Sequence, residues 1–232
     1  MIYFTGDTHG DFERLSKNAL GMMKPHDTLI VCGDFGFIWT DSKQEQKILT
    51  KLSKRPYNIC LVDGTHENFE SLSAYSTVLW NGGLAHKIRD NIFHLMRGEI
   101  YEIEGKKIFT MGGGEDPDME LQEDEEITTH KEIPTSQDMM NGVNNMERYQ
   151  YKVDYIVTHE PPAKTRDFLL LSSNEILRVT ALGAYLDELS QQTEYSRWFF
   201  GSMHIDRFIS DSQVALFKNI VSAQTGRKPK SK

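Results

Sequence analysis

Histidine and aspartate residues follow short apolar segments at five points along the 232-residue chain. Each segment has the length and composition of a buried β-strand. Ligands of open α/β sheets bind beyond the carboxyl ends of the strands, so we expect these side chains to meet at one edge. The five points are Asp7-Thr8-His9-Gly10, Gly33-Asp34, Asp63-Gly64-Thr65-His66-Glu67, His159 and Gly201-Ser202-Met203-His204.

This set of donors predicts a metal site. A lone histidine after a strand is usually a loop or core residue, but five such points at strand ends are hard to explain by packing. Mixed imidazole and carboxylate donors without cysteine suit Mn, Fe, Zn, Co or Ni rather than a thiolate structural zinc site. A divalent ion lowers the pKa of a bound water and offsets charge on a phosphoryl oxygen, and a second ion about 3.5–4 Å away stabilises the leaving side. The chemistry indicated is therefore hydrolysis.

A strand–helix–strand rhythm must position these residues. Apolar strands are predicted at 2–5, 28–32 and 58–62, and helix-like stretches at 11–23, 41–54 and 68–76 alternate with them. Short buried strands alternating with helices indicate a parallel sheet covered by helices. Later strands are predicted at 92–95, 100–103, 107–111, 153–158, 198–201 and 213–220, with a hairpin turn at 104–106 and a helix at 173–192.

We predict one domain over residues 1–225, because no internal repeat and no second boundary interrupts it. Residues 115–151 are predicted to be an insertion, acidic over 115–126 and helical further on. The acidic part fits a solvated loop, and the alternative is a flap that filters substrates at the mouth of the site. Residues 226–232 are basic and contain proline, which predicts a flexible tail.

The composition excludes several classes of protein. The formal net charge is -8, which argues against broad nucleic-acid binding and favours a small-molecule or nucleotide substrate. An anionic substrate still fits, because a bound metal reverses the local field. No apolar run approaches the roughly 20 residues that cross a bilayer, and no secretory signal is visible. Cys32 and Cys60 lie in apolar strands as buried free thiols, so we expect a cytoplasmic protein with no membrane partner.

The motifs resemble a known family. Asp-x-His, Gly-Asp, Gly-Asn-His-Glu, His and Gly-His-x-His after successive strands form the signature of calcineurin-like metallophosphoesterases, and the resemblance runs from Asp7 to His204. Within that family the chain is most similar to small bacterial and phage phosphoesterases of unassigned substrate. The resemblance implies an α/β fold, a four-layer αββα sandwich of two mixed sheets flanked by helices, and a two-metal site.

The resemblance also implies a role for each matching residue. Asp7, His9 and His204 would hold the first metal, and Asp34 would bridge to the second. His159 would bind the second metal. His66 would lie beside the phosphate and protonate or stabilise the leaving oxygen. Mn is the expected metal, with Fe, Zn, Ni or Co as alternatives.

The chain departs from the family pattern at three positions. Thr65 stands where the family has Asn, and Ser202 stands where it has His, so both replaced ligands belong to the second metal. Loss of one strong ligand commonly lowers metal affinity or activity ten- to hundredfold. We therefore predict one firmly bound ion and a weak second one. Phe37 replaces an Asp that orients the acid histidine in many relatives, so His66 must find another partner, for which Glu160 and Glu67 are candidates, or have none.

Two functions agree with this pattern. The first is metal-dependent hydrolysis of a phosphate monoester or diester, of a small molecule or nucleotide, with reduced activity caused by Thr65 and Ser202. The alternative is a catalytically impaired, metal-bearing pseudoenzyme that binds a phosphorylated ligand or a protein partner. Both replacements affect one ion, which is the observation that keeps the alternative open.

Overall fold

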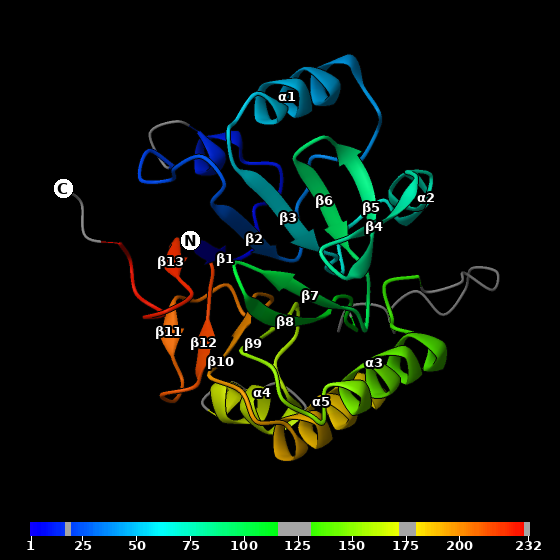
Figure 1. The fold of residues 1–232 in the computed structure, drawn as a ribbon, viewed down its shortest axis with the longest axis vertical. Helices are drawn as coiled ribbons and strands as arrows, with labels where there is room; N and C mark the ends of the chain where they lie inside the picture. The colour runs from blue at the N-terminus through cyan, green and yellow to red at the C-terminus, as the bar shows by residue number, and fades with distance from the viewer. Residues whose placement is uncertain (17–19, 116–130, 172–179, 230–232) are drawn as a thin grey trace.

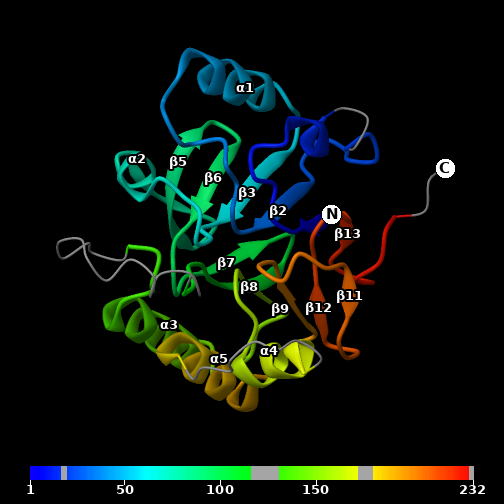
Figure 2. The same cartoon turned by 180° about the vertical axis from the view of Figure 1, so that it is seen from behind.

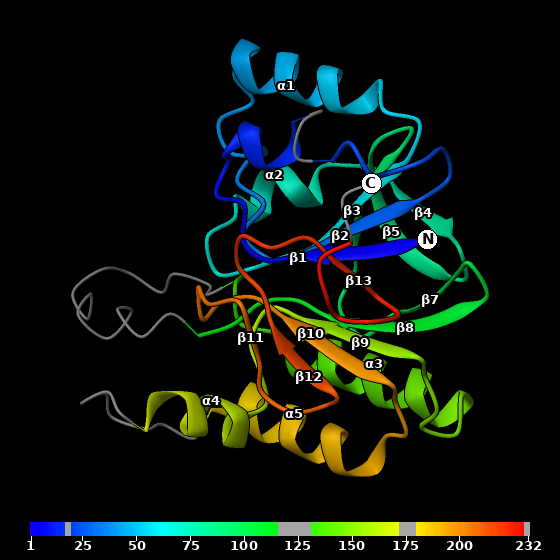
Figure 3. The same ribbon diagram turned by 90° about the vertical axis from the view of Figure 1, so that its left-hand side faces the viewer.

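The computed structural model describes residues 1–16, 20–115, 131–171 and 180–229. Two β-sheets pack face to face, and helices cover the outer face of each (Figures 1 and 3). The predicted fold class, a four-layer sandwich of two mixed sheets flanked by helices, is confirmed.

The first sheet contains β1 (Ile2–Thr5), β2 (Thr28–Cys32), β3 (Asn58–Val62), β4 (Thr77–Trp80), β5 (Gly83–Arg89), β6 (Ile92–Leu95) and β13 (Val221–Ser222). Their order across the sheet is β13-β1-β2-β3-β6-β5-β4. Strands β1, β2, β3 and β6 are parallel, and the outer strands pair antiparallel with their neighbours. The loops that follow β1, β2 and β3 therefore lie at one edge, where the sequence puts most of its candidate donors.

The second sheet contains β7 (Ile100–Ile103), β8 (Lys106–Met111), β9 (Tyr155–Thr158), β10 (Arg197–Phe200), β11 (Arg207–Phe208) and β12 (Gln213–Ala215), in the order β11-β12-β10-β9-β8-β7. Strands β8, β9, β10 and β12 are parallel. The predicted hairpin joins β7 to β8, and Glu104 and Gly105 both have positive φ, as a type I′ turn requires.

Helices form the outer layers (Figure 2). The 3₁₀ turn η1 (Phe12–Leu15), α1 (Lys43–Ser53) and α2 (Phe69–Ser73) cover the first sheet, and α3 (Ser136–Arg148), α4 (Ala163–Leu170) and α5 (Ala181–Gln192) cover the second. Ser42 caps α1 by accepting from the Glu45 N–H, and Thr135 and Asp138 form a capping box on α3. None of the described helices is long and apolar enough to span a membrane.

Three apolar cores hold the layers together. Between the sheets, Phe4 stacks on Phe199 with ring centroids 4.0 Å apart. The predicted buried free thiols Cys32 and Cys60 are confirmed, and both lie in this core. A second core joins the first sheet to α1 and α2, and a third joins the second sheet to its helices around the fully buried Trp198. Burial on both faces rigidifies the strands whose ends carry the candidate donors.

Several predicted elements differ from the structure. The helix predicted at 11–23 is only a 3₁₀ turn in the described residues, because Ser16 returns to an extended conformation; residues 17–19 lie outside the description. The strand predicted at 213–220 ends at Ala215, since Asp206 accepts three backbone N–H groups from residues 217–219 and holds them in a loop. Strands β4, β5, β11 and β13 and helix α4 were not predicted.

The insertion and the tail are only partly described. Helix α3 falls within the predicted 115–151 insertion, whereas 116–130 lie outside the described residues, and so do 172–179 of the helix predicted at 173–192. At the other end, the Ser222 N–H donates to the Arg227 carbonyl, and residues 230–232 lie outside the description. The boundaries of the single domain, the insertion and the tail stay predictions.

Candidate metal centre

Loops from both sheets bring Asp7, His9 and His204 together. Asp7 and His9 follow β1, whereas His204 follows β10 in the other sheet. The Nε2 atoms of His9 and His204 are 3.1 Å apart, and His204 Nε2 lies 3.0 Å from Asp7 Oδ2. One ligand atom from each of the three residues falls within 4.8 Å of the others. The convergence that the strand ends predict is therefore present between the two sheets.

Asp34 and His159 complete the cluster. Asp34 Oδ2 lies 3.8 Å from His9 Nε2, and Asp34 Oδ1 lies 3.9 Å from His159 Nε2. His159 Nδ1 lies 3.0 Å from the Cys32 carbonyl oxygen, to which it donates. This hydrogen bond fixes the tautomer with a lone pair on Nε2, facing Asp34, as is usual for metal-binding histidines.

His66 stands at the open side of the cluster. Its Nδ1 lies 3.1 Å from Asp34 Oδ2 and 3.0 Å from the Thr65 hydroxyl, and its backbone N–H donates to Asp34 Oδ1 at 2.8 Å. The His66 side chain is 59% exposed, whereas Asp34 is 3% exposed. His66 is therefore oriented by the cluster and accessible to a substrate.

Glu67 and Glu160, the candidates for orienting His66, accept hydrogen bonds from backbone N–H groups instead. Glu67 accepts from the Phe35 N–H at 2.8 Å, and Glu160 accepts from the Glu115 N–H at 2.8 Å. Burial raises the pKa of Glu67 to about 8, although the hydrogen bond from Phe35 opposes the shift. Asp34, rather than either glutamate, lies against the His66 ring.

The loop after β10 supplies a backbone contact at the position of the missing histidine. The Ser202 N–H donates to both oxygens of Asp7, at 3.2 and 3.1 Å. Ser202 therefore helps to orient a carboxylate of the cluster.

The cluster residues share an uncommon backbone conformation. His9, Asp34, Ser202 and His204 have φ values of 45°, 45°, 60° and 49°. Each left-handed non-glycine residue costs about 1–3 kcal/mol and persists only where its surroundings impose it. Here the Asp34 carbonyl accepts from the His9 N–H at 2.8 Å. The fold therefore tolerates strained backbone conformations at the residues that form the cluster.

Glycine at two positions leaves room for the carboxylates. A Cβ built on Gly64 would lie 2.0 Å from Asp34 Oδ1, and one on Gly201 would lie 2.1 Å from Asp7 Oδ1. Any larger residue would displace these oxygens, which explains why glycine occurs at both strand ends.

The electrostatics of the cluster fit a divalent cation. Burial raises the pKa of Asp7, and the nearby Asp34 adds to the shift. Burial also opposes ionisation of Asp34, but His159 and the His66 N–H bring the pKa of Asp34 below its usual value. Burial lowers the pKa of His9, which favours the neutral imidazole that binds metals. Two buried carboxylates beside three imidazoles form a donor set whose charge a divalent ion offsets.

Four supporting contacts were missed by the sequence interpretation. The Arg14 guanidinium donates to the backbone carbonyls of Asp7, Gly6 and Phe217. The Phe217 ring packs on the His204 imidazole, with centroids 4.8 Å apart. These contacts tie the loop after β1 to the loop after β12, and no motif marks them in the sequence.

Asp63 follows β3 but is not part of the donor cluster. It is 1% exposed and accepts from Arg97 Nε at 2.8 Å and from Arg97 Nη2 at 2.5 Å. His94 Nε2 lies 3.1 Å from its other oxygen. Burial acts to raise the pKa of Asp63, but Arg97 and His94 bring it well below its usual value. Asp63 is a buried ion-pair partner beneath the loop that carries His66.

A four-layer sandwich with imidazole and carboxylate donors gathered at its strand ends defines a metallophosphoesterase. Residues 1–218 match the family model of the calcineurin-like phosphoesterases, and the chain belongs to this family. The family hydrolyses phosphoesters with bound divalent metals, so metal-dependent phosphoester hydrolysis is the chemistry of this class.

Solved structures share the fold. TT1561 of Thermus thermophilus is 12% identical with a TM-score of 0.55, and the match covers 97% of this chain and 95% of that chain. Phosphopantetheinyl hydrolase (PptH) from Mycobacterium tuberculosis is 15% identical with a TM-score of 0.51, covering 93% of this chain and 89% of that chain. Comparison with the curated proteins gives no match.

Proposed function

We propose that this protein hydrolyses a phosphate monoester or diester of a small molecule or nucleotide, with one firmly bound divalent ion and a weaker second one. The observation that carries the proposal is the convergence of His9 and His204 on Asp7, with Asp34 beside them. Exposed His66 at the open side supports catalysis rather than a closed structural site. The net charge of -8 supports a small substrate over a long nucleic acid.

The donor set suggests how the ions would be held. Asp7, His9 and His204 would hold the first ion, Asp34 would bridge, and His159 would bind the second. Nitrogen and carboxylate donors suit Mn, which we expect to be the native metal, with Fe, Zn, Ni or Co as alternatives. When bound, a divalent ion offsets charge on the phosphoryl oxygens and acidifies a water ligand.

Residues of the chain itself would donate the proton to the leaving group and hold the metal donors in position. His66 Nδ1 is held between Asp34 and Thr65, so Nε2 is the ring nitrogen that would give a proton to the leaving oxygen. The Asp34 carboxylate restrains the ring by lying against Nδ1. Arg14 restrains Asp7 through a hydrogen bond to its backbone carbonyl, and Phe217 restrains His204 through packing of the two rings. His66 therefore acts as the proton donor in this proposal.

The second ion is expected to be weak. The Thr65 hydroxyl is 3.0 Å from His66 Nδ1, and Ser202 offers a short side chain where an imidazole would reach further. Only Asp34 and His159 remain as strong donors for this ion. The same observation keeps a second candidate function, a metal-bearing protein that binds a phosphorylated ligand or a partner without turnover.

Turnover of aryl phosphate monoesters and diesters with added Mn²⁺ tests the proposal. We expect hydrolysis that a chelator abolishes and that the Asp34→Asn variant lowers by about ten- to hundredfold, as loss of a metal ligand commonly does. The ester that is cleaved identifies the substrate class. Wild-type rates equal to those of the variant, at equal Mn²⁺ occupancy, would favour the binding protein instead.

Restoring the two family ligands is expected to strengthen the second site. The double variant Thr65→Asn with Ser202→His should bind a second Mn²⁺ about ten- to hundredfold more tightly and raise turnover at limiting metal. Ser202 has a φ of 60°, a conformation that His9 and His204 already adopt in this site. Calorimetric Mn²⁺ titration beside each single variant measures the stoichiometry. An unchanged second binding event would show that these positions do not limit the second ion.

A further inference from the structure

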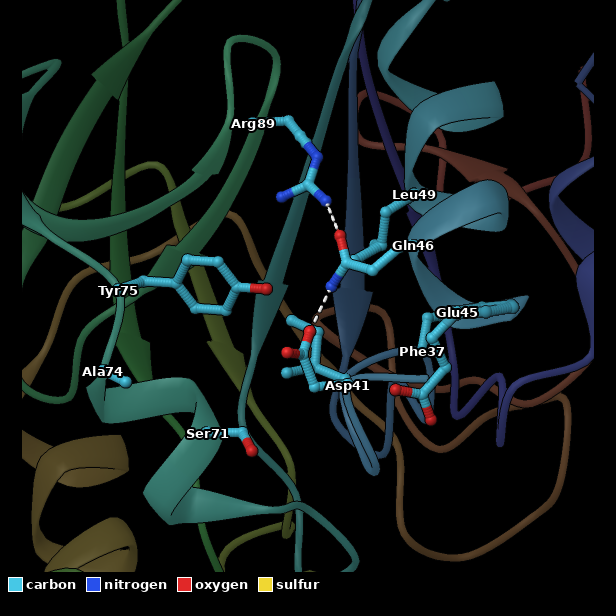
Figure 4. Close-up of a pocket in the computed structure, with 10 residues that line it drawn as sticks. Phe37, Asp41, Glu45, Gln46, Leu49, Ser71, Ala74, Tyr75 and Arg89 are labelled. Carbon is cyan, nitrogen blue, oxygen red and sulfur yellow. Dashed lines mark hydrogen bonds between the residues drawn. The ribbon is translucent and has the colours of Figure 1, made fainter. Parts of the chain in front are cut away.

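A cavity separate from the metal centre lies between α1 and α2 on the outer side of the first sheet. Its volume is about 480 Å³, within the range of small-molecule sites (Figure 4). Phe37, Ile38 and Leu49 give it an apolar lining, and Tyr75 forms part of its wall. None of the candidate metal donors or His66 lines this cavity.

One wall carries a polar chain of three side chains. The Arg89 guanidinium donates to the amide oxygen of Gln46, and the Gln46 amide nitrogen donates to Asp41 Oδ1 at 2.5 Å (Figure 4). A register shift between Lys87 and Arg89 interrupts the β5–β6 pairing next to Arg89. Such irregularities commonly re-aim a side chain. The wall thus offers a cation at one end and a carboxylate at the other, with an amide between them.

The Gln46 amide shows what chemistry this wall accepts. Its carbonyl oxygen faces the cation and its N–H group faces the carboxylate. A ligand with a carbonyl acceptor next to N–H donors would present the same order and could take the place of the amide. The Tyr75 ring stands on the opposite side, with its hydroxyl directed into the cavity (Figure 4).

We propose that this cavity binds a guanine base, as the free base or the nucleoside. Guanine presents O6 next to N1–H and the N2 amino group, so Asp41 accepts two parallel hydrogen bonds and Arg89 donates to O6 and N7. The base lies against the apolar lining, with the Tyr75 hydroxyl facing it from the opposite side of the cavity. Adenine offers one donor group next to one acceptor and leaves the Asp41 carboxylate half-paired. This site goes beyond the proposed hydrolysis and does not depend on it.

Calorimetric titration of the full chain with guanosine tests the site. We expect saturable binding of one guanosine, with adenosine at least about tenfold weaker. Arg89→Met should weaken guanosine binding by about ten- to hundredfold, the effect of losing one bidentate base contact. Gln46→Ala should bind guanosine more tightly than wild type does, because the amide that competes for Arg89 and Asp41 is gone.

The controls separate this site from the metal centre and from misfolding. Asp34→Asn should bind guanosine as wild type does, and loss of binding there would assign the ligand to the metal centre and overturn the proposal. Thermal unfolding shows whether Arg89→Met is folded. If it is not folded, the affinity of Gln46→Ala for guanosine, compared with that of wild type, tests the proposal instead. Guanosine that binds neither wild type nor Gln46→Ala, or that binds folded Arg89→Met unchanged, would also overturn it.

Discussion

Replacing His66 by alanine is expected to lower kcat by about 10²–10⁴-fold for phosphate esters with poor leaving groups, the range lost with a general acid. His66 is the exposed imidazole of the site, and Asp34 and Thr65 hold its Nδ1. Without the proton from Nε2, a high-pKa alcohol must leave as an alkoxide. A series of aryl and alkyl phosphates measured at saturating Mn²⁺ gives kcat against leaving-group pKa.

The dependence on the leaving group distinguishes acid catalysis from a structural role. The His66→Ala deficit should shrink for nitrophenyl esters, whose leaving groups need no proton. A uniform deficit across the series would instead indicate that the variant disturbs Asp34, which accepts from the His66 N–H. His26→Asn is a suitable control, because His26 is exposed, lies outside the site and has a positive φ that asparagine tolerates.

Buried apolar strands were readable from the sequence, whereas edge strands were not. Strands such as Thr28–Cys32 and Asn58–Val62 are almost fully buried runs, so composition alone marks them. By contrast, Thr77–Trp80 alternates exposed and half-buried residues at the sheet edge, and Arg207–Phe208 is exposed. The short edge strands form because they pair with neighbouring strands of the sheet, and the local sequence pattern does not indicate those partners.

The candidate donors could be picked out from the sequence because each of them follows a strand, and their metal-binding roles stay predictions. The partners that aim the donors could not be picked out in this way. Arg14 donates to the carbonyl of Phe217, 203 residues away, and Asp34 lies against the His66 ring, whereas the sequence had offered Glu67 and Glu160 as candidates. Such contacts depend on loop conformation, including the positive φ of Asp34 and His204, which residue type only weakly indicates.

Replacing Arg97 by methionine is expected to lower the free energy of unfolding at pH 7 by about 3–5 kcal/mol, the cost of leaving a buried charge without its partner. The Arg97 side chain is 11% exposed, and the side chain of its partner Asp63 is 2% exposed. Arg97 also donates to the carbonyls of Lys131 and Glu132, so the variant loses these bonds as well. Urea unfolding followed by circular dichroism measures the change.

The pH dependence identifies Asp63 as the cause of the loss. In wild type the pKa of Asp63 is below its unfolded value of about 3.9, so its contribution is present above pH 4 and is lost as pH falls through the folded pKa. Without Arg97, burial raises the pKa of Asp63 and penalises the folded state at neutral pH.

The difference in the free energy of unfolding between wild type and Arg97→Met should therefore narrow from pH 7 toward pH 4. The double variant Asp63→Asn with Arg97→Met should be more stable than Arg97→Met alone. A difference that is constant with pH, or a double variant as unstable as the single one, would mean that Arg97 acts through its carbonyl contacts and packing instead.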